Sequence, residues 1–135
     1  MRCTAISSIQ IPPSVSSVMY SAFEGCTGLT AADLGEIPSI PASMLNQCKS
    51  LPRVSIPDSV SAIGSNAFRN CLNLEVVNFG NTRTTVPGLD NVNAFENVYS
   101  NYVITVPDTL YDIWIDTANW SDGSVRPHIV KWSEL

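Results

Sequence analysis

Four cysteines recur along this chain at a nearly constant interval, and this interval restricts the possible folds more than any other feature. They stand at positions 3, 26, 48 and 71, so the successive gaps are 23, 22 and 23 residues. Thiols that serve catalysis or bind a metal have no reason to keep such a spacing. A chain that stacks similar units does, because each unit must place the same small apolar group at the same point. The spacing therefore predicts a repeat protein.

The residues around each cysteine repeat in phase. Apolar residues follow it at three, six and eight positions, and the pattern ends in the alternation expected of a half-buried strand. These residues are Ile6, Leu29, Leu51 and Leu74, then Ile9, Ala32, Val54 and Val77, then Ile11, Leu34, Ile56 and Phe79. A degenerate copy around Ala94-Phe95 places Val98 where the cysteine would stand. Valine at this position indicates that the column serves packing. The longer spacing before this copy predicts a protruding loop over Thr82–Asn93.

The pattern predicts an α/β fold, a short right-handed solenoid of about four coils of 22–27 residues. Residues 1–107 form the solenoid, and residues 108–135 form a C-terminal cap of the same domain. Strands of a parallel sheet are expected near Ile9–Ile11, Ala32–Leu34, Val54–Ile56, Val77–Phe79 and Val103–Val106, with minor strands around Val18, Ile40 and Ile63. A helix at about Asp108–Asn119 is expected to cover the open core with Trp114 and Trp120, and Ile129-Val130 is expected to form a final strand.

Composition removes several classes of function. The net charge of −5 argues against nucleic-acid binding. No apolar run is long enough for a membrane-spanning helix, so no membrane insertion is expected. No signal peptide is visible in this chain.

The reactive side chains do not form a recognisable chemical site. No cysteine pair has zinc-ligand spacing, although stacking could bring neighbouring cysteines within disulfide range. We interpret all four as buried thiols. His128 is the single histidine, and we assign it to the surface or the cap. Asp108, Asp112 and Asp116 recur every four residues and are expected to form a solvated acidic helix face. No catalytic residue, metal site or cofactor is predicted, and the chain is not expected to be an enzyme.

The polar positions of the strands are the better candidates for binding. One such residue lies between the two inward residues of each strand, and stacking would join them into an exposed row. The predicted binding residues are Gln10, Asp33, Ser55, Asn78 and Thr105, together with Asp90 and Asn91 in the Thr82–Asn93 segment. Such a row suits a protein or glycan contact. Tyr99, Tyr102 and Trp132 are left open between binding and packing.

The repeat resembles the BspA-type leucine-rich repeat family. Residues 56–77, IPDSVSAIGSNAFRNCLNLEVV, are close to the unit of that family, and residues 11–32 follow it well. The resemblance implies a leucine-rich repeat solenoid on a bacterial surface, secreted, or on a phage particle. It implies recognition or adhesion, with a host or bacterial surface protein or glycan as the partner. The alternative is an assembly component of a phage tail or virion that docks, for instance as a homodimer, through its N-terminal coil.

Overall fold

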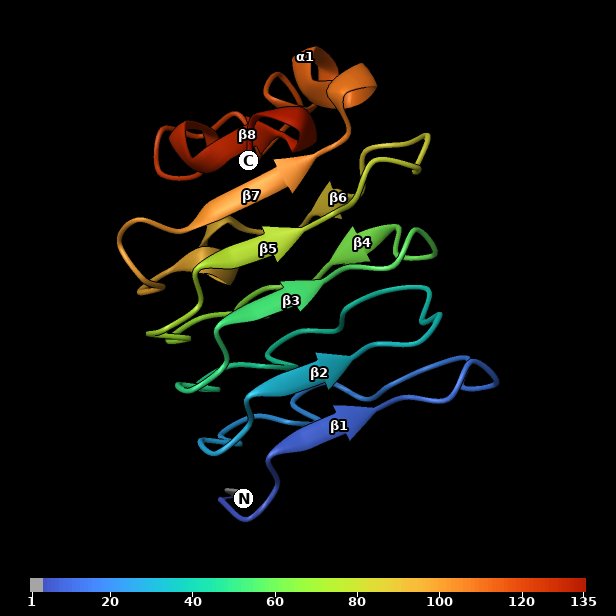
Figure 1. The fold of residues 1–135 in the computed structure, drawn as a ribbon, viewed down its shortest axis with the longest axis vertical. Coiled ribbons are helices and arrows are strands. Elements are labelled where there is room, and N and C mark those ends of the chain that lie inside the picture. The colour runs from blue at the N-terminus through green and yellow to red at the C-terminus, as the bar shows by residue number, and fades with distance from the viewer. Residues whose placement is uncertain (1–3) are drawn as a thin grey trace.

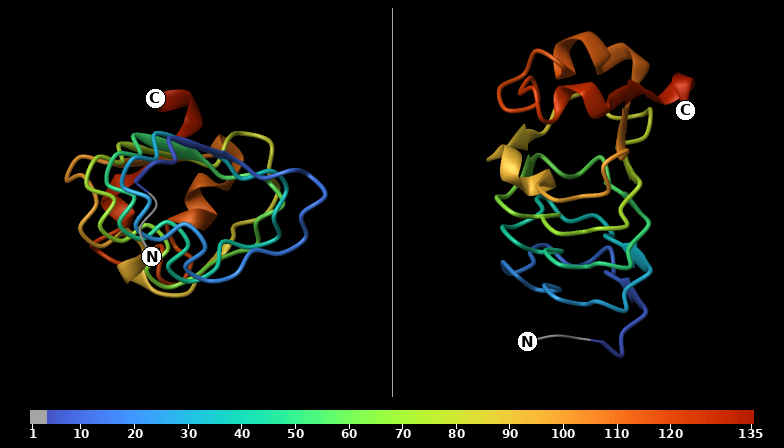
Figure 2. Two further views of the ribbon diagram at one scale, coloured as in Figure 1. Left: turned by 90° about the horizontal axis from the view of Figure 1, so that it is seen from below. Right: turned by 90° about the vertical axis from the view of Figure 1, so that its left-hand side faces the viewer.

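The chain winds into a stack of coils that is closed at one end by its C-terminal segment (Figures 1 and 2). The computed structural model describes residues 4–135, so Cys3 lies outside the described residues. Successive coils contribute the front strands β1 (Ser8–Gln10), β2 (Ala31–Asp33), β3 (Arg53–Ser55), β5 (Val76–Asn78) and β7 (Val103–Val106). All pairings between these strands are parallel, which confirms the predicted solenoid. Four strands begin one residue earlier than predicted, and β7 has its predicted bounds.

The front strands form two sheets instead of one. One sheet pairs β1 with β2, and the other has the order β3-β5-β7-β8, where β8 spans Ile129–Lys131. A proline stands at the break. Thr30 and Glu75 donate their N–H groups to the preceding coil, to Ser7 at 2.8 Å and to Pro52 at 2.8 Å. Pro52 occupies the same repeat position, but it has no N–H to donate to the carbonyl of Thr30, the residue before β2.

The back of the stack is less regular than predicted. Strands β4 (Ala62–Ile63) and β6 (Gly88–Leu89) pair in parallel, and Ile40 forms a single bridge to Ile63. The minor strand expected around Val18 is absent, so that prediction is wrong. Gly64 donates its N–H to the Ile40 carbonyl of the preceding coil at 2.8 Å. Pro41 occupies the same repeat position one coil earlier, and it has no N–H to donate to the coil of Val18.

Side chains from every coil fill the centre of the stack. Cys26, Cys48 and Cys71 have no exposed surface, so their predicted burial is confirmed. The thiol of Cys71 donates to the Leu45 carbonyl at 3.1 Å, and the thiol of Cys48 donates to the Phe23 carbonyl at 3.3 Å. Each contact reaches the preceding coil. The column therefore joins coils as well as filling space.

The C-terminal segment caps the core with two tryptophans. Trp114 and Trp120 are fully buried, and their rings lie 4.8 and 5.7 Å from the ring of Phe79. The helix is shorter than predicted: a 3-10 turn over Asp108–Leu110 precedes α1, which spans only Tyr111–Trp114. After α1 the chain turns, and Trp120 donates its indole N–H to the Pro87 carbonyl at 2.7 Å. The segment continues through 3-10 turns at Arg126–His128 and Trp132–Glu134, on either side of β8.

The Thr82–Asn93 segment does not protrude as a whole, contrary to the prediction. It contains β6 and the start of a 3-10 turn at Val92–Phe95. Arg83 is buried, donates to the Val60 carbonyl at 2.5 Å, and lies 5.5 Å from the Phe79 ring. Burial lowers the pKa of its guanidinium. The segment folds inward because this arginine fills the end of the core.

Gly64 sets how closely two coils can approach. A Cβ at this position would lie 2.5 Å from the Ala42 nitrogen and 2.8 Å from its Cα. We expect Gly64→Ala to lower the free energy of unfolding by about 1–3 kcal/mol, because backbone atoms cannot yield as a side chain does. Urea denaturation measures the loss. Gly123→Ala is the control, since a Cβ there meets nothing within 4 Å. Equal stability of the two variants would contradict this account.

The Cys71 thiol makes stability depend on pH in the alkaline range. Burial raises its pKa far above the ordinary value of 9.0. The folded protein keeps this proton, while the unfolded chain loses it as the pH rises through that ordinary value. The stability that comes from keeping the Cys71 thiol protonated is therefore complete below that pH. It declines above that pH by at most about 1.4 kcal/mol per pH unit. Urea denaturation between pH 7 and 10 should show a steeper decline for the wild type than for Cys71→Ala. Parallel profiles would refute this assignment.

Candidate functional site

The candidate site is the front face of the two sheets. Gln10 on β1, Asp33 on β2 and Ser55 on β3 are exposed there, and Asn78 on β5 is half-buried. The strand registers place Gln10 opposite Asp33 and Ser55 opposite Asn78. These four polar residues therefore form a row across four successive coils.

Thr105 does not extend this exposed row. It is completely buried, and its hydroxyl donates to the Asn78 side-chain oxygen at 2.8 Å. The cause is β8, which pairs beyond β7 with Val130 opposite Thr105. The expectation of an exposed Thr105 is thus corrected: the cap covers the end of the row.

Asp33 and Asn78 also shape the turns that follow their strands. The Asp33 carboxylate accepts the Gly35 N–H at 2.9 Å, and the Asn78 amide oxygen accepts the Gly80 N–H at 2.7 Å. Both glycines have positive φ, +62° and +71°, a conformation that glycine adopts without steric cost. Sequence reasoning missed this role, although an Asp or Asn two residues before a glycine is a signal for such a turn.

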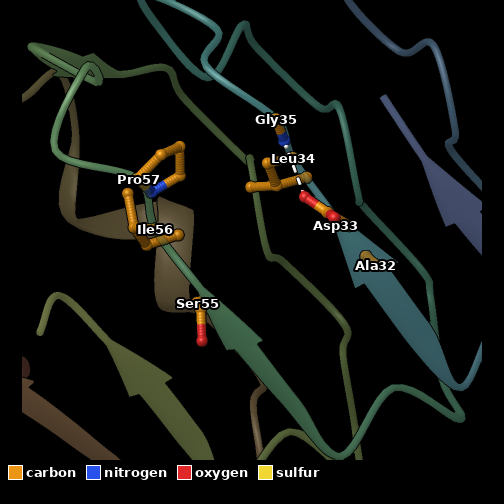
Figure 3. A pocket seen from close by; sticks show the side chains of 7 residues that line it. All are labelled: Ala32, Asp33, Leu34, Gly35, Ser55, Ile56 and Pro57. Atoms are coloured by element: carbon orange, nitrogen blue, oxygen red, sulfur yellow. Dashed lines mark hydrogen bonds between the residues drawn. The ribbon is translucent and has the colours of Figure 1, made fainter. Parts of the chain in front are cut away.

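A groove lies where the two front sheets meet. It has a volume of about 360 Å³ and takes its walls from the ends of β2 and β3 and the residues that follow them (Figure 3). The lining residues are Ala32, Asp33, Leu34, Gly35, Ser55, Ile56 and Pro57. The groove thus contains two of the predicted binding residues, and its position coincides with the break in the sheet. None of its lining residues is basic.

The structure does not bring Asp90 and Asn91 to this face. Both are exposed, but they follow β6, which lies behind the front strands (Figure 1). Asn91 caps the 3-10 turn at Val92–Phe95, where its side chain accepts the Asn93 N–H at 3.0 Å. These two residues therefore lie apart from the front groove, whose lining does not include them.

A second hollow of about 360 Å³ is lined by residues of both the last coil and the cap. Phe95 and Tyr102 form part of its wall, with Glu96, Asn97 and Ser124 among its polar residues. Sequence reasoning missed this site because Ser124 lies far along the chain from the others. Tyr102 is buried and therefore has a packing role. This burial raises the pKa of its hydroxyl. Tyr99 and Trp132 are exposed.

His128 and the acidic residues of the cap make structural contacts. The His128 ring stacks on Tyr102 with centroids 3.8 Å apart. Hydrogen bonds from Ser133 lower the pKa of the Asp108 carboxyl. Asp116 lies 4.0 Å from Arg126. Within residues 4–135, no group of three or more His, Cys, Asp or Glu side chains is arranged to hold a metal ion. The helices of that part of the chain are too short to span a bilayer.

Comparisons with known proteins agree with this architecture. The family model of the BspA type leucine rich repeat region matches residues 1–101 in six copies. The crystal structure of a leucine-rich repeat protein from T. pallidum superposes with a TM-score of 0.67 at 25% identity, over 78% of this chain and 48% of that one. A leucine-rich cell surface protein from Faecalibacterium prausnitzii superposes with a TM-score of 0.65 at 24% identity, over 82% of this chain and 29% of that one. No curated protein matched. The chain thus spans less than half of either neighbour.

The turn after β2 depends on the hydrogen-bond acceptor of residue 33 and not on its charge. We expect Asp33→Ala to lower the free energy of unfolding by about 1 kcal/mol, the usual value of one hydrogen bond. Asp33→Asn should lie near the wild type, because Asn78 accepts the same bond in a later coil. Urea denaturation at neutral pH compares the variants. Equal losses in both would show that the carboxylate charge is what matters.

Proposed function

Because the chain belongs to the BspA-type leucine-rich repeat family, we propose that it is a non-enzymatic recognition module that binds a protein or a glycan through its front face. The observation that carries the proposal is the exposed row of Gln10, Asp33 and Ser55 with a groove at its centre. In repeat proteins, side chains of stacked units join into one extended binding surface. The same geometry here offers several polar groups to one ligand.

The chemistry of the face favours a polar partner. The exposed row carries a carboxylate, an amide and a hydroxyl, and these groups make directed hydrogen bonds. The groove has the size of a small ligand pocket. It is open along the strands, so that it can admit part of a longer chain of sugars or amino acids.

The cell surface is the proposed location. The support is the description of the F. prausnitzii neighbour as a cell surface protein. A surface protein that presents a polar face to its surroundings is suited to adhesion. Binding to another cell or to its secreted glycans would then be the biological role.

A screen of the purified chain tests the proposal. The chain is applied to an array of bacterial and mammalian glycans and to immobilised extracellular proteins. We expect Ser55→Arg to weaken binding to any ligand found by tenfold or more, because a long charged side chain would fill the groove. Ser17→Arg adds the same charge at an exposed position of the return segment after β1 and should bind as the wild type does. Unchanged binding by Ser55→Arg, or no ligand in either panel, would refute the proposal.

A further inference from the structure

A further hollow, which we call the side hollow, lies among the turns that lead into β3, β5 and β7 (Figure 1). It has a volume of about 310 Å³ and shares no lining residue with the front groove. The lining residues are Gln47, Lys49, Asn70, Leu72 and Asn97. Three of them are carboxamides, one is a cation and none is acidic, although the whole chain has a net charge of −5.

The backbone of these turns places the three carboxamides in one column. Gln47, Asn70 and Asn97 each stand directly before the cysteine, or before the valine that replaces it. Their φ angles are +65°, +62° and +58°. The Gln47 N–H donates to the Arg69 carbonyl at 2.8 Å, and the Asn70 N–H donates to the Glu96 carbonyl at 3.0 Å. Successive turns are therefore hydrogen-bonded as strands are, and their amides follow one another at about 4.8 Å.

The protein itself uses only part of the hydrogen-bonding capacity of these groups. The Asn97 side-chain nitrogen donates to the Asn70 side-chain oxygen at 2.9 Å. Among the hydrogen bonds of residues 4–135, none reaches the Gln47 amide or the Asn97 side-chain oxygen. Lys49 is exposed, and the ion pairs of the same residues do not include it. The side hollow thus offers an ammonium, a carboxamide and an acceptor oxygen to a ligand.

Apolar surface accompanies these polar groups. Lys49, Leu72 and Tyr99 occupy the same repeat position in three successive coils, each two residues after one of the carboxamides. Leu72 and Tyr99 are both exposed. An apolar face of a ligand can rest on Leu72, and Tyr99 lies one coil beyond it.

The spacing of the amides favours a sugar over an extended peptide. Groups on one side of an extended peptide recur about every 6.6 Å, which does not match amides that are about 4.8 Å apart. A sugar ring carries several neighbouring hydroxyls, each both donor and acceptor, and these complement carboxamides. Its apolar face suits a leucine or an aromatic ring. The Lys49 ammonium adds a preference for a carboxylate, because no acidic side chain lines the side hollow.

We propose that the side hollow binds a sugar that carries a carboxylate, such as a uronic acid unit of a glycan. The carboxylate pairs with the Lys49 ammonium. The ring hydroxyls bond the amides of Gln47 and Asn97, and the apolar face of the ring rests on Leu72. This inference goes beyond the proposed function, because the site lies outside the front face and needs none of its residues.

Titration of the full chain with trigalacturonic acid tests this proposal. Its methyl ester, the same backbone without the charges, is the matched control. We expect the acid to bind about tenfold more tightly, as one charge-assisted hydrogen bond allows. The side-chain amide signals of Gln47 and Asn97 should shift in NMR spectra. Lys49→Gln should remove the preference for the acid, whereas Lys131→Gln, which removes the same charge from β8, should retain it.

Several outcomes would overturn the proposal. Equal affinities for the acid and the ester, or a preference that survives Lys49→Gln, would show that Lys49 does not recognise a carboxylate. Loss of acid binding in Ser55→Arg would place the ligand in the front groove. Binding of a peptide with a free C-terminus, without binding of an acidic sugar, would assign the side hollow to peptides.

A second probe identifies the acidic sugar. Sialyllactose carries its carboxylate on a sialic acid, and lactose is its neutral control. Binding of either acidic probe that depends on Lys49 supports the proposal, and the probe that binds names the sugar. Binding of neither probe refutes it.

Discussion

The close stacking of one coil on the next is the constraint on which the rest of this structure depends. No single coil can bury its apolar side chains alone, so every coil needs its neighbour for both core and hydrogen bonds. The Cys71 side chain meets both requirements. It fills the core, and its thiol donates a hydrogen bond to the Leu45 carbonyl of the preceding coil. Gly64 shows how little room remains between backbones. Stacking at this distance also aligns the polar residues of the strands into one face.

Prolines divide the stack without separating its core. Pro52 removes a donor between the front strands β2 and β3, and Pro41 removes one between the first two coils at the back. Buried residues such as Leu34 and Ile56 still pack across the front break. The result is a continuous core beneath an interrupted sheet. The groove lies at this interruption, so the break in the sheet and the candidate site coincide.

Most of the fold was predictable from the sequence, because the repeat states each inward position several times. The phase of Val54 and Val77 located two strands to within one residue, and the two tryptophans were recognised as the cap. The errors have a common origin. The missing strand at Val18, the short α1 and the buried Arg83 all depend on contacts between residues far apart in the chain. A local pattern does not contain that information.

The sequence by itself determined the repeat, the parallel solenoid and the polar row, since each follows from the spacing of residues within one unit. The tertiary structure alone decided which members of that row are available. It buries Thr105 beneath β8, places Asp90 and Asn91 behind the front strands, and engages Asp33 and Asn78 in turns. It also created the groove between Asp33 and Ser55. The physical reason is that exposure and pairing are properties of neighbouring coils, which a single unit cannot specify.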